Sequence, residues 1–244
     1  QYFGEFGGVN PSISDSSTYT FMAAKTMADT FEGNTDGCHL YSRHTTPSNL
    51  CLGEALAAME GTETANVSAS GMGAITPVLL QLCGAGDHIV SSRTIYGGTY
   101  AFLKNFTPRL AIQTSFVDIT NLEIVEAAIT ENTKVLYCES VSNPLLEVAN
   151  IKGLAALAKK YSLTLVVDNT FSPLSISPIQ LGADVVVHSL TKFINGSSDA
   201  VGGVVCGSQE FIDQLRSVID GACMLLGSTM DSLRASSILK NLRT

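Results

Sequence analysis

The 244-residue chain lacks features that define several common classes of protein. Its longest apolar runs are strand-sized, well short of the roughly 20 residues that a membrane-spanning helix needs. Basic residues are few: 14 Lys and Arg stand against 22 Asp and Glu, a net charge of −8 that argues against a nucleic-acid partner. No basic segment followed by an apolar one opens the chain. We therefore expect no membrane or nucleic-acid partner and a cytoplasmic location.

Cysteine motifs for metal binding or redox chemistry are also missing. The six cysteines form no Cys-x-x-Cys pair, and no Cys/His spacing of the metal-site type occurs. Cys83, Cys138 and Cys206 lie within apolar runs, where a reduced thiol packs as a small hydrophobic group. The pattern predicts reduced cytosolic thiols and no metal site.

Two nucleotide-binding signatures are absent or incomplete. The Walker motif requires a Gly-Lys pair, and the chain has none. The dinucleotide signature Gly-x-Gly-x-x-Gly fits Gly71 and Gly73 but has Thr76 at its third glycine, and no acidic residue follows at the ribose distance. These failures disfavour a nicotinamide-dependent oxidoreductase, which remains an alternative.

Hydrophobic residues, in contrast, make up 45% of the chain, enough to fill the core of an α/β domain. Strand-sized apolar runs alternate with stretches of helical length, which predicts right-handed βαβ units and a mainly parallel sheet. We expect strands at 64–69, 88–91, 111–117, 134–138, 163–167, 184–188 and 200–206. We expect helices at 20–31, 48–59 (capped by Ser48), 73–83, 98–106, 121–129, 151–161 and 209–218, the last being the final helix.

Polar side chains follow the ends of several expected strands. They are Ser70-Gly71, Tyr96, Glu139, Asp168 and the segment Ser189-Leu190-Thr191-Lys192. Because functional residues of parallel sheets gather at the carboxyl ends of the strands, we expect these groups to meet in one site. This clustering is the strongest sequence argument for an enzyme.

The most informative of these strand ends carries Lys192. A lysine that follows a buried strand is unfavourable unless its amine is paired, exposed or chemically used. Asp168 ends a second buried strand, and a lysine and an aspartate at the ends of adjacent strands are what a pyridoxal phosphate site requires. Taken singly, each has an ordinary explanation: Asp168 caps the turn at Asn169-Thr170, and Lys192 is a solvated lysine.

A turn of small residues at 68–73 joins an expected strand to an expected helix. Its backbone N–H groups can approach a phosphate at the N-terminus of that helix, where the helix dipole also helps. A plain tight turn is the alternative.

Six ordered blocks give the chain a family resemblance. They are Tyr41-Ser42-Arg43, Ser70-Gly71-Met72-Gly73-Ala74-Ile75, Tyr96-Gly97-Gly98-Thr99, Glu139-Ser140-Val141-Ser142-Asn143-Pro144, Val167-Asp168-Asn169-Thr170-Phe171 and His188-Ser189-Leu190-Thr191-Lys192-Phe193. With these blocks the chain resembles the pyridoxal-phosphate enzymes of cysteine and methionine metabolism, the cystathionine γ-synthase-like group, most closely the methionine γ-lyases. The resemblance covers nearly the whole chain.

The resemblance implies a fold and a division into domains. The fold is the large domain of the aspartate-aminotransferase type, an α/β domain with a mainly parallel seven-stranded sheet and helices on both faces. Residues 1–47 would form an extended N-terminal arm and inter-subunit loop, and residues 48–220 the cofactor-binding domain. Residues 221–244 would begin the linker to a smaller C-terminal domain that the chain does not reach, so no arginine is assigned to the substrate carboxylate.

The resemblance also implies catalytic roles for three residues. Lys192 would form an imine with pyridoxal 5'-phosphate and, once displaced by substrate, transfer protons. Asp168 would pair with the pyridinium nitrogen and keep it protonated. Tyr96 would stack on the ring, with its phenol close enough to act in proton transfer.

Further residues would hold the cofactor. The amides of Gly71 and Met72 and the hydroxyls of Ser189 and Thr191 would bind the phosphate, and Asn143 would contact the cofactor hydroxyl or the substrate carboxylate. Tyr41 and Arg43 would reach the phosphate of a neighbouring subunit, which implies a homo-oligomer, a dimer or a homotetramer. Arginine suits this role because its fork binds phosphate bidentately.

The implied activity is α,γ-elimination from methionine or a related sulfur amino acid, which yields a 2-oxo acid, ammonia and a thiol. Many methionine γ-lyases have a cysteine where this chain has Gly98. Cystathionine γ-lyase activity and γ-replacement, as in O-acetyl- or O-succinylhomoserine sulfhydrylases and cystathionine γ-synthase, therefore stay open. A non-catalytic protein with a retained fold is a further alternative, against which the intact Lys192 and Asp168 argue.

Overall fold

One sheet organises the computed structural model, which describes residues 7–33 and 37–242. Within these residues its strands are β1 (Thr64–Ser68), β2 (His88–Ser92), β3 (Gln113–Val117), β4 (Thr133–Glu139), β5 (Thr164–Asp168), β6 (Val185–Ser189) and β7 (Gly203–Gly207). They are arranged in the order β1-β7-β6-β5-β4-β2-β3. The strands from β6 to β3 run parallel, and β7 is antiparallel to both of its neighbours. The expected seven-stranded, mainly parallel sheet is confirmed.

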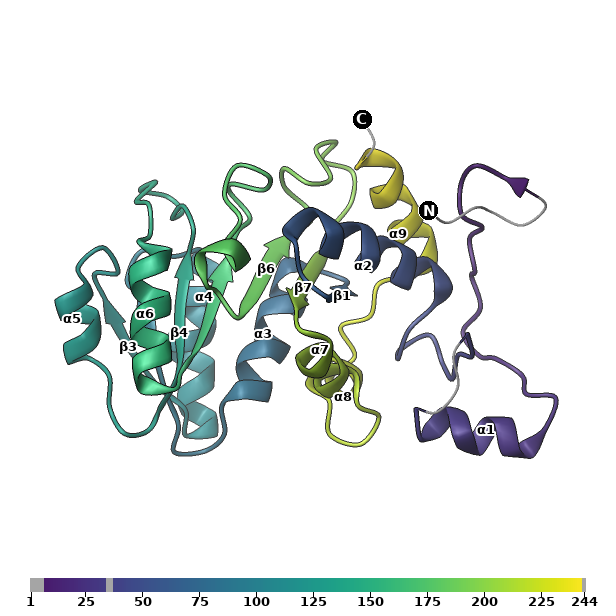
Figure 1. Ribbon diagram of the computed structural model, residues 1–244, viewed down its shortest axis with the longest axis horizontal. Helices are drawn as coiled ribbons and strands as arrows, with labels where there is room; N and C mark the ends of the chain where they lie inside the picture. Colours follow the sequence, from purple (N-terminus) through teal and green to yellow (C-terminus); the bar gives the residue numbers. More distant parts are fainter. Residues whose placement is uncertain (1–6, 34–36, 243–244) are drawn as a thin grey trace.

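Helices cover both faces of this sheet (Figure 1). One face is covered by α2 (Pro47–Glu60), α5 (Leu122–Ala127), α6 (Ile151–Tyr161) and α9 (Ser232–Asn241). The other is covered by α3 (Gly71–Leu82), α7 (Gln209–Arg216), α8 (Ala222–Leu226) and the helical segment that starts with α4 (Gly97–Ala101). Short 3₁₀ turns occur at Thr107–Leu110 and Ile179–Leu181.

The valines of β6 show why the central strands are apolar throughout. Val186 packs into the core on the α2 side, whereas Val185 and Val187 pack into the core on the α3 side. A strand buried on both faces needs apolar residues at successive positions. The polar residues of the central strands are therefore displaced toward the strand ends.

The N-terminal arm lies away from the sheet (Figure 1). Its described part contains α1 (Ala24–Phe31), which begins later than the expected helix at 20–31, and an isolated bridge between Thr18 and Tyr41.

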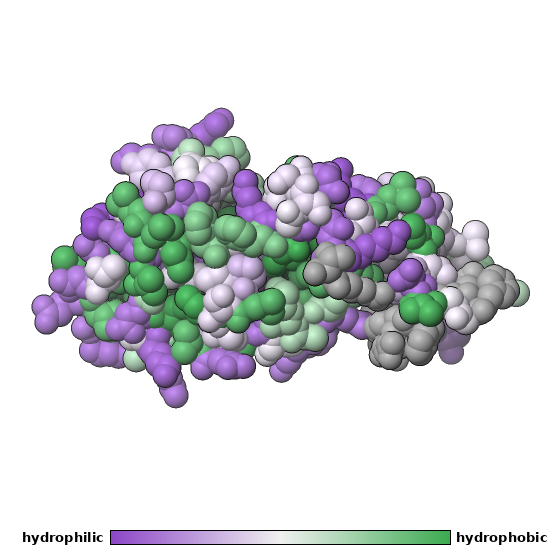
Figure 2. Space-filling view, turned by 90° about the horizontal axis from the view of Figure 1, so that it is seen from above, coloured by the Kyte–Doolittle hydropathy of each residue, from purple (hydrophilic) through white to green (hydrophobic). Residues whose placement is uncertain are grey.

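Seen from above, apolar side chains gather over the left and middle of the molecule, between polar ones (Figure 2). Exposed apolar residues of the arm include Val9, Met22 and Phe31.

One expectation about the start of a helix was wrong. The cap of α2 is Thr46, whose Oγ1 accepts the N–H of Asn49 at 3.2 Å, and not Ser48. Pro47 takes the first helical position, where its missing N–H costs nothing, and so moves the start by one residue. The helix expected at 98–106 is confirmed: α4 runs directly into a π-helical turn at Phe102–Phe106.

The expectation that the helix at 209–218 is the last was also wrong. Two more helices, α8 and α9, follow it, and Met230, Ala235 and Ile238 are buried in the core on the α2 side. The serines and charged residues of α9 hide its apolar spacing in the sequence. Residues 221–242 thus pack on the domain, and the domain boundary at residue 220 stays a prediction.

Candidate active site

A cavity of about 300 Å³ opens at the carboxyl ends of the parallel strands. It gathers side chains and backbone from the segments that follow β1, β2, β4, β5 and β6. The lining residues are Ser70, Gly71, Met72, Ile75, Tyr96, Glu139, Val141, Asn143, Asp168, Thr170, Phe171, Ser189, Thr191, Lys192 and Val201. The structure therefore brings together the site residues predicted from the sequence, except Tyr41 and Arg43.

The N-terminus of α3 forms one wall of the cavity. Ser70 caps this helix, its Oγ accepting the N–H of Gly73 at 2.9 Å. The first N–H groups of a helix have no partner within it, so those of Gly71 and Met72 are suited to an anion. Gly71 lies directly against Ser189: a Cβ at position 71 would be 2.8 Å from the Cβ of Ser189. This close approach sets a hydroxyl beside the helix end, a donor set that fits a phosphate.

Thr191 also lines the cavity, but its hydroxyl is already engaged. Its Oγ1 accepts the N–H of Gly202 at 3.1 Å and lies 3.3 Å from the carbonyl oxygen of the same residue, to which it donates. The hydroxyl hydrogen would have to turn from this carbonyl toward the cavity to bind a phosphate.

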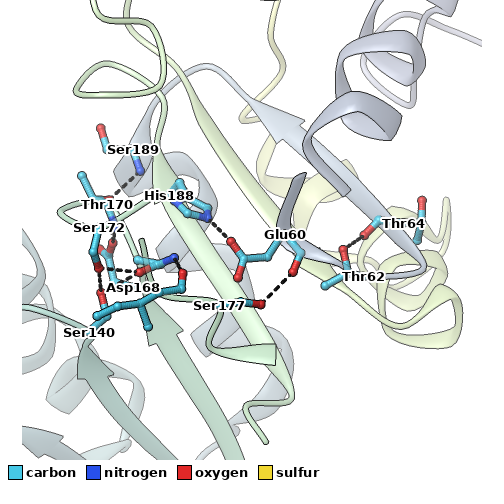
Figure 3. Close-up of polar contacts among 12 residues, drawn as sticks. Glu60, Thr62, Thr64, Ser140, Asp168, Thr170, Ser172, Ser177, His188 and Ser189 are labelled. Carbon is cyan, nitrogen blue, oxygen red and sulfur yellow. Dashed lines mark hydrogen bonds and ion pairs between the residues drawn. The ribbon is translucent and has the colours of Figure 1, made fainter. Parts of the chain in front are cut away.

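Asp168 is buried at the end of β5 and held by its neighbours (Figure 3). Its Oδ1 accepts the backbone N–H of Thr170 at 3.0 Å and the Thr170 hydroxyl at 2.5 Å. Its Oδ2 accepts a longer bond, 3.5 Å, from the buried hydroxyl of Tyr137. Burial raises the pKa of Asp168, and the hydrogen bonds from Thr170 oppose that rise. Asp168 thus caps a turn and lines the cavity at once.

Thr170 is a site residue that the sequence analysis did not assign. Its Oγ1 accepts the backbone N–H of Ser189 at 2.8 Å while donating to Asp168, so it joins the end of β5 to the end of β6 (Figure 3). Its position two residues after an aspartate is the signal of an Asx-type turn.

Lys192 is exposed and lines the cavity from the turn that follows β6. Two hydrogen bonds hold its backbone: its N–H donates to the carbonyl of Ser189 at 3.3 Å, and its carbonyl accepts the N–H of Gly196 at 2.9 Å. Beside it, the rings of Phe171 and Phe193 meet edge to face at 5.7 Å. The lysine backbone is fixed while its flexible side chain reaches into the cavity.

Tyr96 precedes α4, and its side chain is 47% exposed. The ring lies over Gly98, since a Cβ at position 98 would be 2.5 Å from the Tyr96 Cε1. The glycine at this position therefore has a local consequence: any side chain there would displace the Tyr96 ring.

Glu139 ends β4 beside Asp168, its register partner on β5. Its Oε1 accepts the backbone N–H of Tyr96 at 2.6 Å, and its Oε2 accepts that of Asn143 at 2.7 Å. Burial, followed by the charge of Asp168, raises the pKa of Glu139 to about 7. Sequence reasoning placed Glu139 at a strand end but gave it no role.

The sequence analysis also gave no role to His188 and Glu60, which form a buried pair behind the cavity. The Nε2 of His188 lies 2.9 Å from the Oε2 of Glu60, and both side chains are buried (Figure 3). The pair joins the last residue of α2 to β6, one residue before Ser189. A histidine inside an apolar strand was the only sequence signal for it.

Tyr41 and Arg43 do not line the cavity of their own chain. The Arg43 guanidinium donates to the carbonyl oxygen of Met224 at 2.7 Å and lies 5.6 Å from the centre of the Tyr41 ring. A role toward a neighbouring subunit stays a prediction.

The described residues give little support to cysteine chemistry, metal binding or membrane insertion. Cys83, Cys138, Cys206 and Cys223 are buried free thiols, and burial raises the pKa of Cys138 to about 12, which makes it unreactive. Among residues 7–33 and 37–242, no His, Cys, Asp and Glu side chains cluster so as to hold a metal ion. No helix in the same residues is long and apolar enough to cross a membrane.

Strand ends that gather a lysine, a buried aspartate and a helix N-terminus suited to a phosphate are typical of a pyridoxal-phosphate-dependent enzyme. The model of the family described as Cys/Met metabolism PLP-dependent enzyme matches residues 2–244, and the chain belongs to this family. A methionine γ-lyase of Arabidopsis thaliana is 49% identical over 235 residues, covering 94% of this chain and 53% of the relative. An O-succinylhomoserine sulfhydrylase of Pseudomonas aeruginosa is 39% identical over 242 residues, covering 99% and 58%.

A solved structure supports the fold assignment. A putative O-acetylhomoserine (thiol)-lyase from Campylobacter jejuni, crystallised with pyridoxyl-lysine phosphate, matches with a TM-score of 0.90 and 28% identity. The match covers 100% of this chain and 68% of that one. The chain spans just over half the length of the two curated relatives.

Proposed function

We propose that this chain carries the cofactor-binding part of a carbon–sulfur lyase, which eliminates a thiol from the γ-carbon of methionine or a related sulfur amino acid. The products are a 2-oxo acid, ammonia and the thiol. The observation that supports this most is the single cavity that holds Lys192 and Asp168 next to the N-terminus of α3. The 49% identity to a methionine γ-lyase supports the reaction class.

The residues of the cavity fit pyridoxal phosphate, which when bound supplies an electron sink for the carbanion formed at the α-carbon. Lys192 would accept the α-proton on Nζ and return a proton at a later carbon, for which its amine must be neutral. Asp168 would hold a proton on the ring nitrogen, and Thr170 keeps its carboxylate in place. The Gly71 and Met72 amides and the Ser189 hydroxyl would bind the phosphate.

Reduction with borohydride tests this proposal directly. Treating the full-length protein with pyridoxal phosphate and borohydride should fix a pyridoxyl group on the peptide that contains Lys192. The Lys192→Ala variant should carry no label and should lose its visible absorbance band. A label on another lysine, or none at all, would refute the proposal.

A γ-replacement enzyme is the second candidate. Two observations favour it: residue 98, against which the Tyr96 ring lies, is a glycine and not a cysteine, and the P. aeruginosa sulfhydrylase is 39% identical. In that reaction an incoming thiol would add where the leaving group departed. Comparing turnover of methionine with turnover of O-acetylhomoserine plus sulfide distinguishes the two.

We also propose that the active protein is a homo-oligomer, a dimer or tetramer, in which Tyr41 and Arg43 serve the neighbouring subunit. The arm that carries them exposes Val9, Met22 and Phe31 by 73%, 106% and 57%, large apolar areas of the kind that interfaces cover. Mixing Lys192→Ala with Arg43→Ala subunits tests this, because a shared site would regain activity in the mixture. A mixture of the two variants that stays inactive would contradict a site shared between subunits.

A cytoplasmic location stays a prediction, supported by the four buried thiols.

A further inference from the structure

Glu139 makes an unusual pair of contacts within the cavity. It is 6% exposed, and each of its carboxylate oxygens accepts one backbone N–H. The two donors belong to different loops: Tyr96 lies between β2 and α4, and Asn143 lies beyond β4. One side chain therefore bridges the two loops that border this part of the cavity.

A carboxylate is the only side chain that can make this bridge. Two N–H donors approach two separate oxygens, so both ends of the group must accept. An amide of the same shape has one accepting oxygen, and its NH₂ would face a second donor. Hydrogen bonds to an ionised acceptor are also roughly twice as strong as neutral ones. The short distances of 2.6 and 2.7 Å agree with this.

The two loops carry residues that would contact the cofactor. Tyr96 is half exposed and has no side chain beneath it at Gly98, so its backbone position is what locates the ring. Asn143 lies in a loop whose side chains at Leu145 and Leu146 are exposed, by 65% and 58%. Ile95 anchors the Tyr96 loop from one side, since it is buried in the core on the α3 side, and Glu139 holds the backbone at Tyr96 itself.

Glu139 is not suited to be the base of the reaction. Both of its oxygens are engaged by N–H groups, whereas the Lys192 side chain is exposed in the same cavity. The negative charge of Asp168 on β5 disfavours a negative charge on Glu139. The other titratable side chains next to it, Tyr137 and Cys138, lie on its own strand β4. Burial and the charge of Asp168 raise the pKa of Glu139, and the N–H groups of Tyr96 and Asn143 oppose that rise because they favour the ionised form.

We propose that Glu139 is a positioning residue that clamps the Tyr96 and Asn143 loops at the spacing which the cofactor ring requires. The inference rests on the proposed function, since it assigns Tyr96 and Asn143 to the cofactor. Cofactor binding and the clamp would support each other, because the clamp would keep open the part of the cavity that Tyr96 and Asn143 line.

The test compares Glu139→Gln with Glu147→Gln in the full-length protein. Glu147 lies on the same loop but pairs with Arg93 at 3.6 Å outside the cavity, which makes it a matched control. Loss of one charge-assisted bond should raise the dissociation constant for pyridoxal phosphate about tenfold to a hundredfold in Glu139→Gln. The visible circular dichroism of the bound cofactor should shrink with it, and Glu147→Gln should match wild type. An unchanged dissociation constant and dichroism in Glu139→Gln would overturn the clamp.

Hydrogen exchange of the wild-type protein tests the clamp without any variant. The amides of Tyr96 and Asn143 should exchange slowly although they lie in loops, both with and without cofactor. If they exchange as fast as unbonded loop amides, the clamp is refuted even where Glu139→Gln fails to fold. Failure of the proposed function would show differently, as missing borohydride labelling of Lys192 in the wild type.

Discussion

Without its cofactor, the protein should become less stable as the pH rises through the titration of Glu139. The pKa of this carboxyl is about 7 in the folded chain, against an ordinary value of 4.5. Between these two values the folded state keeps a proton that the unfolded state has released, so the free energy of unfolding falls with rising pH. The full shift corresponds to about 3 kcal/mol, a large part of the stability of a typical domain.

Urea denaturation of the cofactor-free protein at about pH 5 and about pH 8 measures this effect. Between these two pH values, the free energy of unfolding of the wild type should fall by about 2–3 kcal/mol more than that of Glu139→Gln, because glutamine does not titrate. The pKa of Asp168 is also raised, and its contribution of the same sign is present in both proteins. Stability curves that run parallel in the two proteins would refute the reasoning.

Two substitutions test other contacts of the site. Thr170→Val removes the donor to Asp168 Oδ1, a bond to a carboxylate worth about 1.5–3 kcal/mol, so the dissociation constant for pyridoxal phosphate should rise at least about tenfold. Thr170→Ser should stay near wild type in the same titration, and equal losses in both variants would contradict this. Gly98→Cys should displace the Tyr96 ring, change the visible circular dichroism and shift the ratio of methionine to O-acetylhomoserine turnover. Gly97→Cys, where an added Cβ meets open space, is its control, and identical spectra for the two would count against the packing argument.

The sheet was predictable because its signal is local and repeated. Each central strand, such as β5 or β6, is a short apolar run bounded by polar residues, and its position in the chain fixes its direction in a βαβ unit. The end of the chain was not predictable in this way. In α9 the buried positions are Ser232, Ala235 and Ile238, a weak apolar signal, and what makes this helix part of the domain is its packing against α2.

The site was predictable where a residue's chemistry stands out in its own segment. Lys192 and Asp168 follow apolar strands and are conspicuous there. The supporting residues are defined by partners far away in the chain: Glu139 is 43 residues from Tyr96, and Glu60 is 128 residues from His188. No spacing rule in the sequence links such pairs, because only the order of strands in the sheet brings them together.

The geometry of Asp168 shows that a structural and a functional explanation of one residue can both hold. Its two oxygens have different partners: Oδ1 takes both bonds from Thr170, and Oδ2 has a single long contact with Tyr137. The turn therefore fixes the carboxylate through one oxygen and leaves the other weakly bonded. An oxygen that is buried and weakly bonded gains most from a cationic partner, because burial raises the pKa of the group and a positive charge would lower it again. The capping turn would thus make Asp168 a rigid acceptor for the protonated ring nitrogen that the proposed function requires, and losing the cap should weaken cofactor binding as well as the fold.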